Sequence, residues 1–97
     1  MPVEALKNIG ATSAAWLRAL GVETRADLVR LGPVFVYLLL RHRFPGRGIG
    51  LLMLYALEGA LTGQPWTALD PDTRARLRAE AHGAALDTRY SGDAAGT

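Results

Sequence analysis

Near its start the chain reads LKNIGATSAAWLRALGVETRADL, from Leu6 to Leu28. The order is apolar-x-x-apolar-Gly, then a small residue, then Leu followed by Gly-Val-x-Thr. Gly10 and Gly21 mark tight turns, and the apolar residues around them recur at helical spacing. This order predicts two short helices joined at a glycine turn, a helix-hairpin-helix. Its apolar positions are Leu6, Ile9, Leu17, Leu20 and Val22.

Glycine and proline also punctuate the chain beyond this hairpin, which predicts a series of short helices. The segment from Thr24 to Asp27 is typical of a capping box, and Asp70 before Pro71 is typical of a helix start. Within the hairpin we expect Thr12 or Ser13 to cap the second helix. The expected helices cover residues 3–8, 12–20, 24–31, 33–42, 50–62 and 70–86, with the leucine-rich helix 50–62 at the centre.

The segment from Val34 to Leu40 is apolar at every position. Its β-branched and aromatic residues would also suit a buried strand, but we predict a helix because no other segment can pair with it. A helix that is apolar all round is buried on all sides, so a second chain is expected to cover part of it. The expected interaction surface consists of Phe35, Tyr37 and Leu39.

Length and composition favour a single all-α domain that binds a partner. With 97 residues the chain has room for one thin core, yet its hydrophobic residues amount to 49%. A homo-oligomer or another protein would cover the excess apolar surface. We predict a compact five- or six-helix domain over residues 1–87. Residues 88–97, which are mostly small and polar, are expected to form a disordered tail.

Several classes of protein and site are excluded by what the sequence lacks. There is no cysteine, which excludes disulfides and thiolate metal ligands. His42 and His82 have no further ligands at suitable spacing, so no metal and no cofactor are expected. The first residues do not resemble a secretory signal. The longest apolar run, from Pro33 to Leu40, is far shorter than the roughly 18 residues of a spanning helix, which predicts a cytoplasmic protein.

The glycine turn at Gly10 suggests a contact with duplex DNA. Such a turn allows close approach to a phosphate, and the following helix presents unpaired N–H groups to the anion. The alternative is a hairpin that serves only for packing or protein binding, and Asn8 favours it because DNA-binding hairpins usually have a second glycine there. A run of arginines from Arg74 to Arg78 is interpreted as a solvated helix face. The expected DNA-backbone residues are Lys7, Gly10, Thr12, Ser13, Arg41, Arg43 and Arg47.

Catalysis is not expected, because no nucleophile and base are placed together. Glu58 lies in an apolar helix, but an ion pair with an arginine is a simpler role for it than acid–base chemistry. Trp16 and Trp66 are expected to pack between helices rather than to stack on bases.

A resemblance to a known family follows from the hairpin together with LLMLYALEGALTGQPWTALDPDTRARL, from Leu51 to Leu77. The LYALEGAL segment with the later Gly63, Trp66 and Leu69 resembles the C-terminal domain of the TfoX/Sxy bacterial competence regulators. The likeness extends over roughly residues 4–80. The hairpin alone is also similar to the C-terminal domain of the RNA polymerase alpha subunit.

The resemblance implies an all-helical fold and a role in transcription regulation of DNA-uptake genes, without enzymatic activity or a cofactor. Full-length members carry an N-terminal α/β domain, and we expect this chain to act without it, because Met1 lies just before the matching segment. We therefore expect a non-enzymatic binding and regulatory module that contacts protein, with duplex DNA as a further partner. The alternative is an oligomerising or adaptor protein without nucleic-acid contact.

Overall fold

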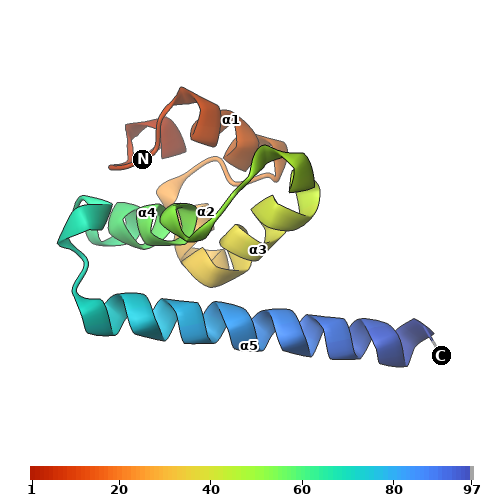
Figure 1. Cartoon of the computed structure of the whole chain (residues 1–97). Helices are drawn as coiled ribbons and strands as arrows, with labels where there is room; N and C mark the ends of the chain where they lie inside the picture. Colours follow the sequence, from red (N-terminus) through yellow and green to blue (C-terminus); the bar gives the residue numbers. More distant parts are fainter. Residues whose placement is uncertain (97) are drawn as a thin grey trace.

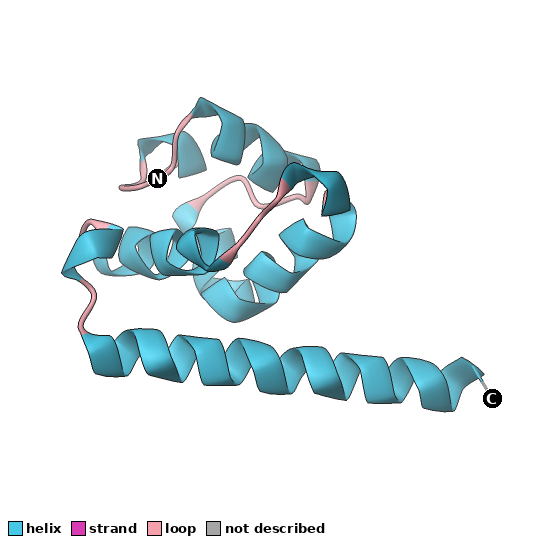
Figure 2. Cartoon of the chain, viewed as in Figure 1, coloured by secondary structure: helices cyan, strands magenta, loops and turns pink. Residues whose placement is uncertain are grey.

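The computed structural model describes the backbone of residues 1–96 and the side chains of residues 1–84. Residues 1–96 form α-helices and short 3-10 turns, without a strand (Figures 1 and 2). The all-α prediction is therefore confirmed. The helices are α1 (Ala11–Ala19), α2 (Arg25–Leu31), α3 (Pro33–Arg43), α4 (Leu51–Thr62) and α5 (Pro71–Gly96), and the 3-10 turns are η1 (Val3–Ala5), η2 (Pro45–Arg47) and η3 (Trp66–Ala68).

Helix α4 lies at the centre of the core. The first four α-helices gather into one globule, and α5 runs along its side as a long rod (Figure 1). Helix α4 contacts α2, α3, η3 and α5, and its Leu54 and Leu57 have no exposed surface. Residues of every other α-helix complete this core, among them Leu17, Leu28, Leu40 and Leu77. The predicted central helix is thus confirmed.

Local hydrogen bonds explain where the helices begin. Thr24 and Asp27 form the predicted capping box at α2, in which the Asp27 amide donates to Thr24 Oγ1 over 3.2 Å. Asp70 caps α5 as predicted, because the Thr73 amide donates to Asp70 Oδ1 over 2.7 Å. The predicted cap of α1 is wrong. Its N-cap is Gly10, which makes no side-chain bond, and Ala11 is already helical.

The apolar residues of helix α3 are unevenly covered within this chain. Val36 and Leu40 are fully buried, whereas Phe35 retains 50% of its surface. One face of α3 therefore packs on the core of this chain and the other remains open.

Helix α5 continues to Gly96, beyond the expected end near Leu86. The predicted disordered tail covers residues 88–97, where residue 97 and the side chains of the others lie outside the described part of the chain, and it stays a prediction.

Candidate functional site

The corner of the hairpin is held by Asn8, the residue that replaces the expected glycine. Its φ of 72° lies in the left-handed region that asparagine tolerates better than most residues. Its side-chain nitrogen donates to the carbonyl oxygens of Ala56 at 3.3 Å and Gln64 at 3.0 Å. The Trp66 amide donates to Asn8 Oδ1 over 3.2 Å. Asn8 therefore ties the hairpin to the end of α4 and to η3.

Gly59 in α4 makes room for this tie. A Cβ at Gly59 would lie 2.5 Å from Asn8 Nδ2 and 2.6 Å from the carbonyl oxygen of Gln64, both far closer than real contacts allow. Only glycine therefore permits the amide of Asn8 to reach the backbone of α4. We call Asn8 and Gly59, with the bonds of Asn8 to Ala56, Gln64 and Trp66, the Asn8 junction. The sequence analysis missed it, because its members are about 50 residues apart.

The structure brings part of the predicted DNA-backbone set together. Ala14 is the first amide of α1 to donate within the helix, to the carbonyl oxygen of Gly10, so the preceding amides have no intrahelical acceptor. Thr12 lies among them and is exposed, as Lys7 is just before the turn. Ser13 lines a hollow of about 280 Å³ together with Arg47. The start of α1 and the α3–α4 connection therefore share one surface.

Arg43 lies beside the surface formed by the start of α1 and the α3–α4 connection, whereas Arg41 contacts Tyr37 on α3. The guanidinium of Arg43 lies 4.9 Å from the ring centroid of Phe44, and that ring stacks on Trp16 with centroids 5.8 Å apart. Arg41 instead donates to the hydroxyl of Tyr37 over 3.3 Å. The guanidinium of Arg74 lies 5.9 Å from the ring centroid of Trp66. Both tryptophans therefore pack within the chain, as expected.

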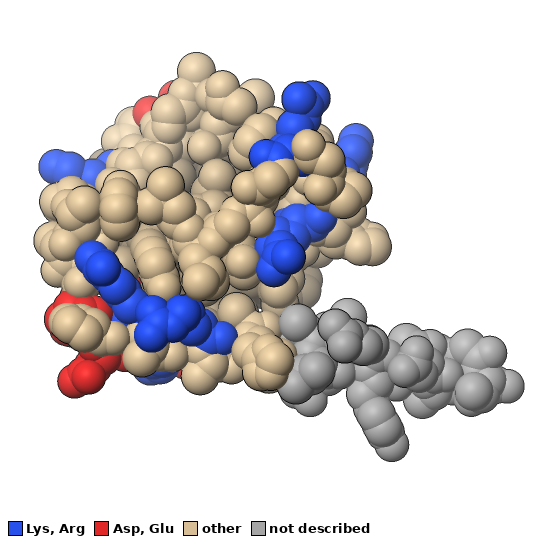
Figure 3. Space-filling model, in the orientation of Figure 1, with Lys and Arg blue, Asp and Glu red and all other residues tan. Residues whose placement is uncertain are grey.

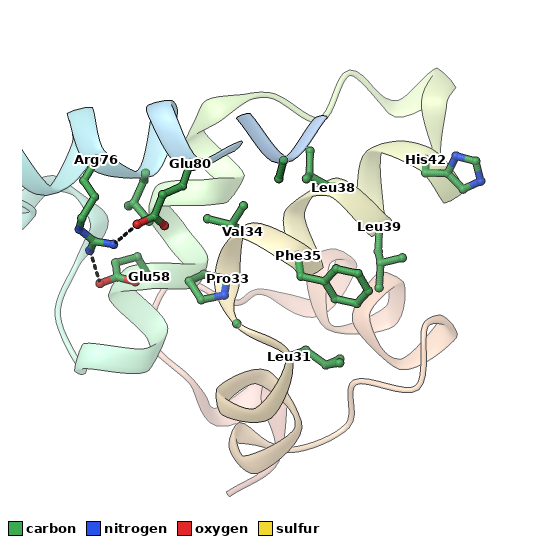
Figure 4. A pocket seen from close by; sticks show the side chains of 13 residues that line it. Leu31, Pro33, Val34, Phe35, Leu38, Leu39, His42, Glu58, Arg76 and Glu80 are labelled. Carbon is green, nitrogen blue, oxygen red and sulfur yellow. Dashed lines mark hydrogen bonds and ion pairs between the residues drawn. The ribbon is translucent and has the colours of Figure 1, made fainter. Parts of the chain in front are cut away.

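Phe35 and Leu39, two residues of the predicted interaction surface, line an apolar groove of about 620 Å³ between α3 and α5. Val34, Phe35, Leu38 and Leu39 line it from α3 (Figure 4). Tyr37, which the sequence analysis placed on this surface, is only 2% exposed. Since Tyr37 follows Phe35 by two positions, helical periodicity turns it toward the core, and it does not line the groove.

One end of the groove is polar. Arg76 of α5 lies 3.7 Å from the carboxylate of Glu58 on α4 and 3.1 Å from that of Glu80 (Figure 4). The ion pair with Arg76 explains how Glu58 is tolerated on the central helix. It also agrees with the expectation that Glu58 pairs with an arginine.

The charges are unevenly spread over the surface. On the face in Figure 3, lysine and arginine side chains gather over α5 and over the edge of the globule on the right, while acidic side chains lie at the rim.

In the part of the chain that the structure describes, no three His, Cys, Asp or Glu side chains are grouped as a metal site would need. None of the described helices combines the length and apolar character of a membrane span.

Comparisons with known proteins agree with this architecture. A family model, the TfoX C-terminal domain, matches residues 2–81. The crystal structure of an uncharacterized protein from Listeria monocytogenes superposes with a TM-score of 0.73 at 28% sequence identity, over 80% of this chain and 86% of that chain. No curated protein matches the sequence.

Proposed function

Since the chain belongs to the TfoX C-terminal domain family, we propose that it is a non-enzymatic binding module of a cytoplasmic regulatory system. In this role it would contribute to transcription regulation or DNA uptake by holding a partner protein. The observation that carries the proposal is the apolar groove between α3 and α5. A second copy of this chain is the partner that the groove fits best.

The groove supports a protein partner because it leaves apolar surface in water. Phe35 is half exposed, and Val34, Leu38 and Leu39 are only partly covered. Burial of a large apolar side chain contributes about 1.5–3 kcal/mol. Several such side chains together help to offset the loss of translational and rotational freedom on association, which costs at least about 4 kcal/mol.

A second copy is favoured by the arrangement of the groove itself. Phe35 lines the groove and also projects from it, so the ring of one copy can enter the groove of the other and receive a ring in return. Such a reciprocal contact is what a twofold dimer requires. The charged cluster of Arg76, Glu58 and Glu80 at one end would form the polar rim.

The test is the mass of the chain in solution, measured by light scattering over a range of concentrations. We expect a dimer that Phe35→Asp converts into a monomer, because a carboxylate would be buried in the contact. Val29→Asp is the matched control: Val29 is an exposed apolar residue of α2 outside the groove, and its variant should remain dimeric. A wild-type chain that stays monomeric at the highest concentration, or equal loss in both variants, would refute the dimer.

A second candidate function is contact with the backbone of duplex DNA. It is favoured by the shared hollow of Ser13 and Arg47 beside the open start of α1. The amides before Ala14 would donate to phosphate, while Lys7 and Arg43 would add charge. Contacts of this kind give affinity without sequence readout.

The measurement for this candidate is the affinity for a short duplex at several salt concentrations. Affinity should fall steeply with salt, and Lys7→Glu should weaken binding and reduce the salt dependence. Arg30→Glu changes the net charge equally but alters an exposed residue of α2 away from the hollow. If both variants bind equally well, the hairpin does not contact DNA.

A further inference from the structure

We propose that Arg41, Arg78 and His82 form a binding pocket for a phosphate group. They line a hollow of about 430 Å³ between the last turn of α3 and the middle of α5. Tyr37 and Leu51 complete its walls. This pocket shares Leu38 with the groove of Phe35 but none of its charged residues, so the proposal does not rest on the proposed function.

The charge of the pocket is the first argument. Two guanidinium groups and an imidazole face one hollow, and none of the described residues that line it is acidic. Other arginines of the chain, such as Arg18 and Arg76, lie against carboxylates. Two guanidinium groups at one hollow, with no carboxylate among the described residues that line it, favour a bound anion as their counter-charge.

The second argument is the way in which the two arginines are held. Arg41 Nη1 donates to the Tyr37 hydroxyl over 3.3 Å, and Arg78 Nη1 donates to the hydroxyl of Tyr55 over 2.9 Å. A neutral hydroxyl orients a guanidinium without neutralising it. Each arginine thus keeps its full charge and further N–H groups for a ligand, in the fork geometry that suits phosphate oxygens.

The third argument is the surroundings of these groups. His82 follows Arg78 by one helical turn, so that both project from the same face of α5. Leu38, Leu51 and Ala81 also line the hollow. The helix dipole favours a cation such as Arg41 near the C-terminal end of α3. It does not account for Arg78 and His82, which lie in the middle of α5.

A phosphate group in this pocket has two sources, a free phosphate compound or a nucleic-acid backbone. Both offer the same oxygens to the arginines. We therefore assign the pocket to the phosphate group and separate the sources by experiment.

The first experiment is a titration of the full chain with inorganic phosphate in chloride buffer at constant ionic strength, followed by ¹H–¹⁵N NMR. We expect saturable shifts at the amides of Arg41, Arg78 and His82. Arg78→Gln should weaken binding about tenfold, because a charge-assisted contact is lost. Arg18→Gln is the matched control, since Arg18 is paired with Glu4 and lines neither this pocket nor the groove of Phe35.

A second titration uses a short DNA duplex under the same conditions. Saturation by inorganic phosphate assigns the pocket to a free phosphate compound, and saturation by the duplex alone assigns it to a nucleic-acid backbone. No shift at the three residues with either probe overturns the proposal, as does equal weakening by Arg18→Gln. Should Arg78→Gln fail to fold, as judged by circular dichroism, Arg41→Gln provides the same test from α3.

Discussion

The Asn8 junction and the face between α3 and α5 differ in how far the chain satisfies its own groups. At the junction, the side-chain oxygen and nitrogen of Asn8 are bonded to backbone groups from distant segments. On the α3–α5 face, Phe35 is half exposed and Arg41 has a neutral hydroxyl as its partner. A region satisfied within the chain serves the fold, whereas an unsatisfied one is available to a partner. Substitutions in the two regions should therefore act on different quantities.

The largest effect on stability is expected for Gly59→Ala at the junction. Its Cβ would meet both Asn8 Nδ2 and the carbonyl oxygen of Gln64, so backbone must shift and the bonds of Asn8 must break. Overpacking of this kind costs about 3 kcal/mol. Urea unfolding followed by circular dichroism measures it. Gly83→Ala is the matched control in α5, where a Cβ meets nothing and alanine should instead stabilise the helix by about 0.5 kcal/mol.

Substitutions of Asn8 should have a smaller effect that separates its backbone from its side chain. Asn8→Ala loses the side-chain bonds and also strains a residue held at φ 72°, at a cost of about 2 kcal/mol. Asn8→Gly loses only the bonds and should cost about 1 kcal/mol. The same unfolding measurement applies. If the two variants are equally stable, the left-handed backbone contributes nothing.

Because Asn8 would contact a Cβ at Gly59, the effects of Asn8→Gly and Gly59→Ala on the free energy of unfolding should not be additive. With Asn8 replaced by glycine, the atom nearest to the new Cβ of Gly59→Ala is gone. The double variant should therefore be more stable than the sum of the single effects indicates. Simple additivity would mean that Asn8 and Gly59 act independently.

On the α3–α5 face, a single substitution of an exposed side chain should leave the free energy of unfolding almost unchanged. Phe35→Asp replaces an exposed ring, so the free energy of unfolding of the monomer should change by less than about 0.5 kcal/mol. The measurement requires a concentration at which the wild-type chain is monomeric, because association itself stabilises the fold. A large loss of stability in the monomer would show that Phe35 belongs to the core.

The sequence predicts those features that depend on neighbouring residues. The capping box of Thr24 and Asp27 and the cap at Asp70 lie within one helical turn, so their spacing alone indicates them. The hairpin and the apolar character of α3 are equally local. The family resemblance extends the prediction to the whole all-α fold. The match to the family model confirms the family, and the helices of residues 1–96 confirm the fold.

Features built from distant segments are not visible in the sequence. In the sequence, Asn8 indicates only that a glycine typical of DNA-binding hairpins is missing. Its role becomes clear from its hydrogen-bond partners near Gly59. Tyr37 belongs to an apolar run, and only the packing of α3 shows that it faces inward while Phe35 faces out. Arg41 lines one hollow with Arg78 and His82 only because α5 lies beside α3, and the sequence does not show this position of α5.

The smallest expected effect is one of pH, and it separates the helix caps from the junction. Hydrogen bonds from the amides of Glu23 and Thr24 lower the pKa of Asp27, and the bond from the Thr73 amide lowers the pKa of Asp70. A lowered pKa in the folded state means that the stabilisation is present above the unfolded pKa of about 4. It is lost as the pH falls through the folded value. The Asn8 junction contains no titratable group and should not respond to acid.

Melting temperatures near pH 6 and near pH 3 measure this difference. Wild-type protein should melt at a lower temperature in acid, and Asp27→Asn should reduce the difference, because its amide oxygen can still accept a bond but does not titrate. Asn8→Gly should lower the melting temperature equally at both pH values. If Asn8→Gly removes the pH dependence while Asp27→Asn preserves it, acid acts through the junction and not through the caps, and the division between the two kinds of contact fails.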